Sequence, residues 1–103
     1  MFEIKHGEQG ELILVGRLDA ARADDAAAQF DAIAESTVVD MGRLDYISSM
    51  GLGLLVKTQK RLKGSGDRSL KLVNVNPHIN DIFQFSGFHH IFEIEVRPNR
   101  DDA

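Results

Sequence analysis

A chain of 103 residues, with 43% apolar and 27% charged residues, has the size and balance of one globular domain. It contains no cysteine, which excludes disulfides, thiolate catalysis and cysteine-ligated zinc. The net charge of -4 argues against a general nucleic-acid role, and no apolar run approaches the roughly 20 residues of a membrane helix. The first residues lack the pattern of a signal peptide, so we expect a cytoplasmic protein without membrane insertion.

The N-terminal third predicts a hairpin followed by a helix. Residues 2–5 and 11–15 have strand character, and the polar segment 8–10 between them is typical of a turn. We expect Gly16 to break the second strand. Residues 20–35 are rich in alanine with apolar positions at helical spacing, and we expect this helix to end at Ser36.

The middle third predicts a buried strand and an amphipathic helix. Residues 37–41 are short, β-branched and almost continuously apolar, which is typical of a strand covered on both faces. A helix is expected from about residue 49 to 63, with Leu52, Leu55 and Leu62 on its apolar face.

The last third repeats this alternation. Residues 70–75 predict a strand, and Asn76 is expected to cap a helix that starts at Pro77 and ends at Ser86. Residues 92–96 alternate between apolar and polar side chains, as a half-buried edge strand does. The tail, residues 97–103, is polar.

Strands that alternate with helices imply mostly parallel pairing with right-handed crossovers, and the opening hairpin adds an antiparallel strand. We therefore predict an α/β fold: a single domain over residues 2–96 with a mixed, mostly parallel sheet covered by helices.

The turn before the second helix carries the most distinctive residues. Ser48, Ser49, Gly51 and Gly53 stand where a strand gives way to a helix. Backbone N–H groups are unpaired at a helix N-terminus, so a serine there suits either a capping role or a phosphate group. The amides of residues 51–53 would receive part of the charge of such a phosphate.

Three segments together resemble the STAS family, the sulfate-transporter and anti-sigma-factor-antagonist domain, over about residues 2–96. They are residues 16–19, residues 38–55 with the serine–glycine turn, and residues 70–77 followed by 85–88 and 92–94. The resemblance implies a non-enzymatic regulator without a cofactor, of the kind found in stand-alone anti-sigma factor antagonists.

In that family a serine at the start of the second helix is phosphorylated by an anti-sigma serine kinase of the histidine-kinase-like ATPase type. The unphosphorylated form binds the kinase, and a PP2C-type phosphatase restores it. The resemblance implies that Ser49 is the phosphorylated serine, with Ser48 as the alternative. Here Ser48 occupies a place that is usually acidic, and Met50 replaces a second hydroxyl.

The expected partner-binding surface surrounds this serine. Its members are Asp19, Ser48, Ser49, Met50, Gly51, Gly53, Leu54 and Lys57. Met50 and Leu54 would supply apolar contacts, and the bare glycines would allow close approach of a partner.

Alternative functions stay open. The chain could be a phosphorylation-independent adaptor of a transporter or signalling complex, or a sensor of an anion or nucleotide. The basic cluster at residues 57–63 suits either a solvated helix end or an acidic partner. Solvation or turn capping is the simpler interpretation of Asp40 and Asp45. Packing or solvation is the simpler interpretation of the four histidines and of Phe83, Phe85, Phe88 and Phe92.

Overall fold

Five strands form a mixed sheet in the computed structural model, which describes residues 1–97. The strands are β1 (Phe2–His6), β2 (Leu12–Leu18), β3 (Thr37–Ile47), β4 (Leu70–Val75) and β5 (Glu93–Val96), and they lie in the order β1-β2-β3-β4-β5. β1 pairs with β2 in the antiparallel sense, and the other pairs are parallel. The predicted hairpin, mixed sheet and edge strand are confirmed.

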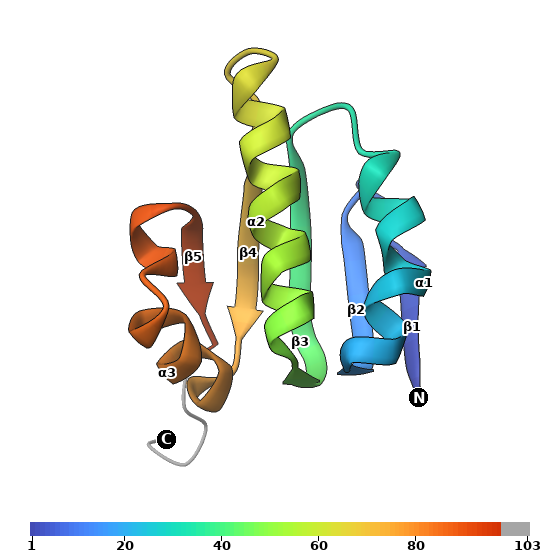
Figure 1. Cartoon of the computed structure of the whole chain (residues 1–103), viewed down its shortest axis with the longest axis vertical. Helices are drawn as coiled ribbons and strands as arrows, with labels where there is room; N and C mark the ends of the chain where they lie inside the picture. Colours follow the sequence, from blue (N-terminus) through green and yellow to red (C-terminus); the bar gives the residue numbers. More distant parts are fainter. Residues whose placement is uncertain (98–103) are drawn as a thin grey trace.

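Three α-helices connect the parallel strands: α1 (Ala20–Asp31), α2 (Ser49–Gly64) and α3 (Pro77–Phe85). A short 3-10 helix, η1 (Phe88–His90), follows α3. Each crossover moves one strand further in the same direction, so right-handed connections place all the helices on one face of the sheet, as Figure 1 shows. In residues 1–97 no helix has both the length and the apolar composition needed to cross a bilayer.

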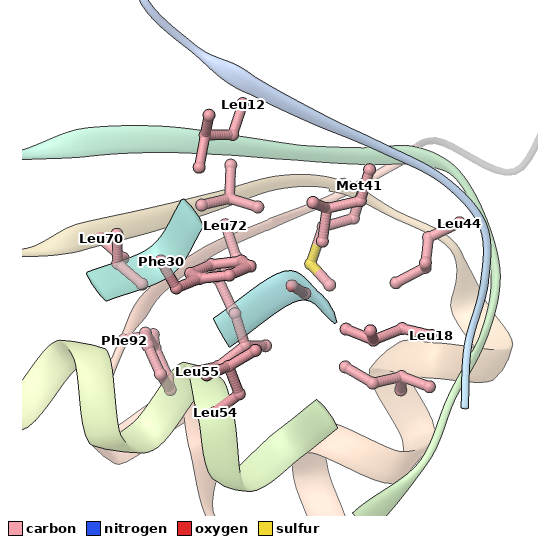
Figure 2. Packing of buried hydrophobic residues seen from close by; sticks show 14 of the residues in the cluster. Leu12, Leu18, Phe30, Met41, Leu44, Leu54, Leu55, Leu70, Leu72 and Phe92 are labelled. Atoms are coloured by element: carbon pink, nitrogen blue, oxygen red, sulfur yellow. The ribbon is translucent and has the colours of Figure 1, made fainter. Parts of the chain in front are cut away.

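The hydrophobic core fills the space between the helices and this face of the sheet (Figure 2). Phe30 of α1, Leu55 of α2 and Phe83 of α3 are fully buried against strand residues such as Met41 and Leu72. Burial of this kind is the main stabilising contribution to a small domain.

The apolar face of α2 is rotated relative to our prediction. Leu55 and Leu62 are buried as expected, but Leu52 is only partly buried. Leu54, Thr58 and Gln59 complete the buried face. The hydrophobic pattern misses this face because two of its members are polar.

Two strands continue further than we predicted. β2 passes through Gly16 to Leu18, because Gly16 adopts a φ of 97° at an irregularity in the pairing with β3. A Cβ there would overlap the carbonyl oxygen of Met1, which accepts a hydrogen bond from the Arg17 amide at 2.9 Å. β3 likewise runs to Ile47 and not to residue 41.

The prediction that residues 37–41 are covered on both faces is wrong, since Val38 is 38% exposed while its neighbour Val39 is buried.

Lys71 bridges Glu93 and Glu95 at N–O distances of 3.0 and 2.7 Å. Hydrogen bonds to Glu95 and then Glu93 raise the pKa of Lys71.

Helix α1 ends earlier than predicted, at Asp31 and not at Ser36. The guanidinium of Arg61 donates to the carbonyl oxygens of Ile33 at 2.8 Å and Phe30 at 2.9 Å. These bonds satisfy carbonyls at the helix end and explain where it stops. Of the predicted polar tail, residues 98–103 lie outside the described residues.

Candidate functional site

Three helix N-termini gather at one edge of the sheet, because β2, β3 and β4 are parallel and all end there. Each helix has a side-chain cap whose oxygen accepts a hydrogen bond from a backbone amide of the first turn. The caps are Asp19 at 3.0 Å, Ser48 at 3.1 Å and Asn76 at 2.8 Å. The predicted capping role of Asn76 is thereby confirmed, and Asp19 caps its helix in the same way.

The start of α2 is joined to the neighbouring strands. The Ser48 amide donates to the Leu18 carbonyl at 2.9 Å. The Asn76 side-chain amide donates to the Leu44 carbonyl at 3.1 Å, which joins the start of α3 to β3, the strand that leads into α2. The first turn of α2 therefore projects from a fixed position at the sheet edge.

The two adjacent serines differ in their surroundings. Ser48 is half-buried, and its hydroxyl oxygen accepts from the Gly51 amide as the N-cap of α2. Ser49 is the first helical residue and is exposed, and within residues 1–97 its hydroxyl has no hydrogen-bond partner. The capping role thus belongs to Ser48 and leaves the Ser49 hydroxyl accessible.

Two backbone amides of this turn are bonded to the cap residue. The Gly51 amide is taken by the Ser48 hydroxyl, and the Leu52 amide donates to the Ser48 carbonyl at 2.9 Å. In this structure both amides already have partners in the cap residue, and the expectation that they receive part of a phosphate's charge stays a prediction.

The structure divides the expected partner-binding residues into surface and support. Ser49, Gly53 and Lys57 are exposed at successive i, i+4 positions of α2, and Met50 is 52% exposed beside them. Asp19 and Ser48 are half-buried at the adjoining caps.

Gly51 and Leu54 lie beneath this surface. A Cβ at Gly51 would lie 2.9 Å from Ile47 Cγ1 and 3.0 Å from Leu18 Cγ, so this glycine permits close packing of α2 on the sheet. Leu54 is only 8% exposed. Our expectation of an exposed apolar contact holds for Met50 and is wrong for Leu54, which faces the core.

An exposed cation–π pair adjoins this edge and was not singled out from the sequence. The Arg17 guanidinium carbon lies 4.3 Å from the centre of the Tyr46 ring, a cation–π contact between β2 and β3. Both residues are exposed. The alternation of Arg17 with buried neighbours is a signal for it, but we ended both strands before these positions.

A groove of about 600 Å³ lies between α2 and the segment that follows α3. Its lining consists of Leu52, Gly53, Val56, Lys57, Lys60, Ser86 and Phe88. Phe83, Phe88 and Phe92 pack in the core as predicted, with ring centres 4.9 and 5.1 Å apart. Phe85 was also expected in the core and is instead 94% exposed, because it points away from the sheet at the end of α3.

The basic cluster and the carboxylates have distinct roles. Arg61 caps α1, whereas Lys57 and Lys60 line the groove. Asp40 accepts from the Gly42 amide at 2.9 Å and the Asn74 side chain at 3.1 Å, which is the turn-capping role predicted for it. Among residues 1–97 no three histidine or carboxylate side chains lie close enough to hold a metal ion.

The sequence of this chain matches a known protein family. The model of the STAS domain matches residues 5–103. The chain belongs to the STAS-domain family. BtrV of Bordetella bronchiseptica, provisionally assigned as an anti-sigma factor antagonist, is 38% identical over 85 residues, which cover 79% of this chain and 72% of that protein.

Solved structures support the same fold. The anti-sigma factor antagonist SpoIIAA in its unphosphorylated form matches with a TM-score of 0.67 and 17% identity, over 100% of this chain and 94% of that one. The phosphorylated form of the Bacillus cell fate determinant SpoIIAA matches with a TM-score of 0.65 and 20% identity, over 100% and 96% of the two chains.

Proposed function

We propose that this STAS domain is an anti-sigma factor antagonist whose binding to an anti-sigma kinase is switched off by phosphorylation of Ser49. The observation that carries the proposal is the exposed Ser49 hydroxyl, which has no hydrogen-bond partner within residues 1–97, beside a neighbour that already caps the helix. The chain is the substrate of the kinase and not itself a catalyst. Its relative BtrV, which is provisionally assigned as an anti-sigma factor antagonist, supports this function.

The proposed switch needs no change of fold. A phosphate would add about -1.5 to -2 charges at the first residue of α2, where the helix dipole favours negative charge. A partner surface fitted to the neutral serine would meet both the bulk and the charge of the phosphate, and Asp19, which follows the Leu18 carbonyl bonded by the Ser48 amide, adds negative charge at this end of the sheet. The fold resembles both the unphosphorylated and the phosphorylated structures of SpoIIAA, which is consistent with such a change at the surface.

The partners follow from the same proposal. The kinase is of the histidine-kinase-like ATPase type and contacts Ser49, Met50, Gly53 and Lys57, with Asp19 and Ser48 at the margin. A PP2C-type phosphatase removes the phosphate. A difference in affinity of about 3 kcal/mol between the two forms would be enough for an effective switch.

The test combines the pure protein with a candidate kinase and ATP. Residues 44–57 form one tryptic peptide that holds both serines, and its fragment ions separate Ser48 from Ser49. We expect one phosphate, on Ser49, in the wild type and in the Ser48→Ala control, and none in Ser49→Ala.

Binding without ATP tests the switch itself. Ser49→Ala should bind the kinase about as well as the wild type, and Ser49→Asp should bind at least about tenfold more weakly. Equal binding of the wild type and Ser49→Asp would contradict the switch and favour a phosphorylation-independent adaptor.

A further inference from the structure

The side chain of Phe85 has no role in the fold or in the proposed switch. It lies at the C-terminal end of α3 and is 94% exposed. A phenylalanine offers roughly 150–250 Å² of surface for burial, and only together with an adjoining apolar groove does it reach the patch size that marks an interaction site.

The groove described above lies directly beside it. Ser86, the next residue in the chain, lines the groove, and Leu52, Val56 and Phe88 give it an apolar floor. One surface therefore carries both a protruding aromatic side chain and a hollow with apolar walls. In a two-fold dimer the same patch serves both copies, so each protruding group meets the other copy's hollow.

Charges around these features are complementary. Asp81 precedes Phe85 by four residues and is exposed on the same face of α3. Lys57 and Lys60 line the groove and are exposed. The ion pairs formed within residues 1–97 involve none of these three side chains. An α3 that docks with Phe85 in the groove carries Asp81 towards the two lysines.

We propose that a second copy of this chain occupies the groove, with Phe85 of each copy inserted between α2 and η1 of the other and Asp81 facing Lys57 and Lys60. Two phenylalanines alone contribute roughly 300–500 Å² to this contact, well below the roughly 1,200 Å² at which standard interfaces begin, so we expect a weak and reversible dimer. The inference does not rest on the phosphorylation switch, although Gly53 and Lys57 line the groove and also belong to the proposed kinase-binding surface.

Sedimentation velocity of the full chain, from about 10 μM to about 1 mM, measures the monomer–dimer equilibrium in the range expected for a weak contact. We expect a dimer at the upper concentrations. Phe85→Ala should weaken it at least about tenfold while leaving the melting temperature unchanged, because Phe85 supports nothing in the monomer. Lys63→Glu is the matched control, since Lys63 is on the same helix but does not line the groove.

Charge reversal tests the orientation of the two copies. Asp81→Lys should weaken the dimer, and so should Lys57→Glu combined with Lys60→Glu. The chain with all three changes should regain affinity to within about threefold of the wild type. Failure of this rescue overturns the proposal.

Other results overturn it as well. One such result is a wild type that is still monomeric at about 1 mM, and another is a dimer that Phe85→Ala does not weaken. A monomer whose groove takes up dodecanoate or an acidic amphipathic peptide, seen as NMR shifts at Leu52 and Val56, also contradicts it.

Discussion

The first turn and the second half of helix α2 both carry polar side chains, but these side chains have different surroundings in the two regions. In the first turn the Ser49 hydroxyl is exposed, and the adjacent Ser48 is the N-cap, whose hydroxyl oxygen accepts from the Gly51 amide. In the second half Gln59 is 2% exposed, and Arg61 reaches across to α1. One region offers groups to a partner, and the other holds the domain together.

This difference shows that a structural or a binding role cannot be assigned to a polar side chain of a helix from its chemistry alone. The side-chain oxygen of Gln59 accepts from the Leu70 amide at 2.7 Å, and its nitrogen donates to the Ile91 carbonyl at 2.8 Å. Gln59 thereby joins α2 to β4 and to the end of η1. Nothing comparable holds the side chains of the first turn, apart from the Ser48 cap.

The largest effect is expected for Gln59→Leu. This change leaves the buried Leu70 amide and the partly buried Ile91 carbonyl without partners and should lower the free energy of unfolding by about 3 kcal/mol. Urea titration measures the loss. The exposed Gln29→Leu should stay within about 0.5 kcal/mol of the wild type. A loss below about 1 kcal/mol for Gln59→Leu would contradict the assigned role.

Substitutions of two glycines in α2 should have effects of intermediate size and opposite sign, because Gly51 is packed against the sheet and Gly53 is exposed. Gly51→Ala places a methyl group against Ile47 and Leu18 and should lower the free energy of unfolding by about 1–2 kcal/mol. At Gly53 an added Cβ meets nothing within 4 Å, so Gly53→Ala should raise that free energy by about 0.5–1 kcal/mol. Thermal unfolding of both variants is the measurement, and equal stabilisation of the two would show that α2 packs less closely than described.

The smallest expected effect distinguishes the adjacent serines. Ser48→Ala removes the helix cap and should lower the free energy of unfolding by about 1 kcal/mol. Ser49→Ala removes a hydroxyl without a partner in residues 1–97 and should change that free energy by less than about 0.5 kcal/mol. Denaturant unfolding of the two variants side by side tests this, and the opposite order would exchange the roles of the two residues.

Much of the architecture could be predicted from local pattern. The glycine and polar residues of 8–10 predict the hairpin, the β-branched segments predict β3 and β4, and Asn76 with Pro77 predicts the start of α3. These features depend on neighbours in the chain, which is why sequence spacing is sufficient for them. The STAS resemblance likewise pointed to the correct family and to the turn at residues 48–53.

Other features depend on contacts between distant residues. Gly16 stays within β2 because Met1 and β3 hold it there, and α1 stops at Asp31 where Arg61, thirty positions further along the chain, meets its last carbonyls. The orientation of α2 is decided by the close approach that Gly51 permits. It buries Leu54 and leaves Met50 exposed.

The sequence by itself determined the order of the elements, the mixed sheet and the place of the serine–glycine turn, because these follow from periodicity and turn chemistry within a few residues. Only the tertiary structure decided that Ser48 caps while Ser49 stays accessible, that Phe85 lies outside the core, and that a groove opens between α2 and η1. The physical reason is that exposure is a property of how elements pack, and no local pattern specifies which face of a helix its neighbours leave uncovered.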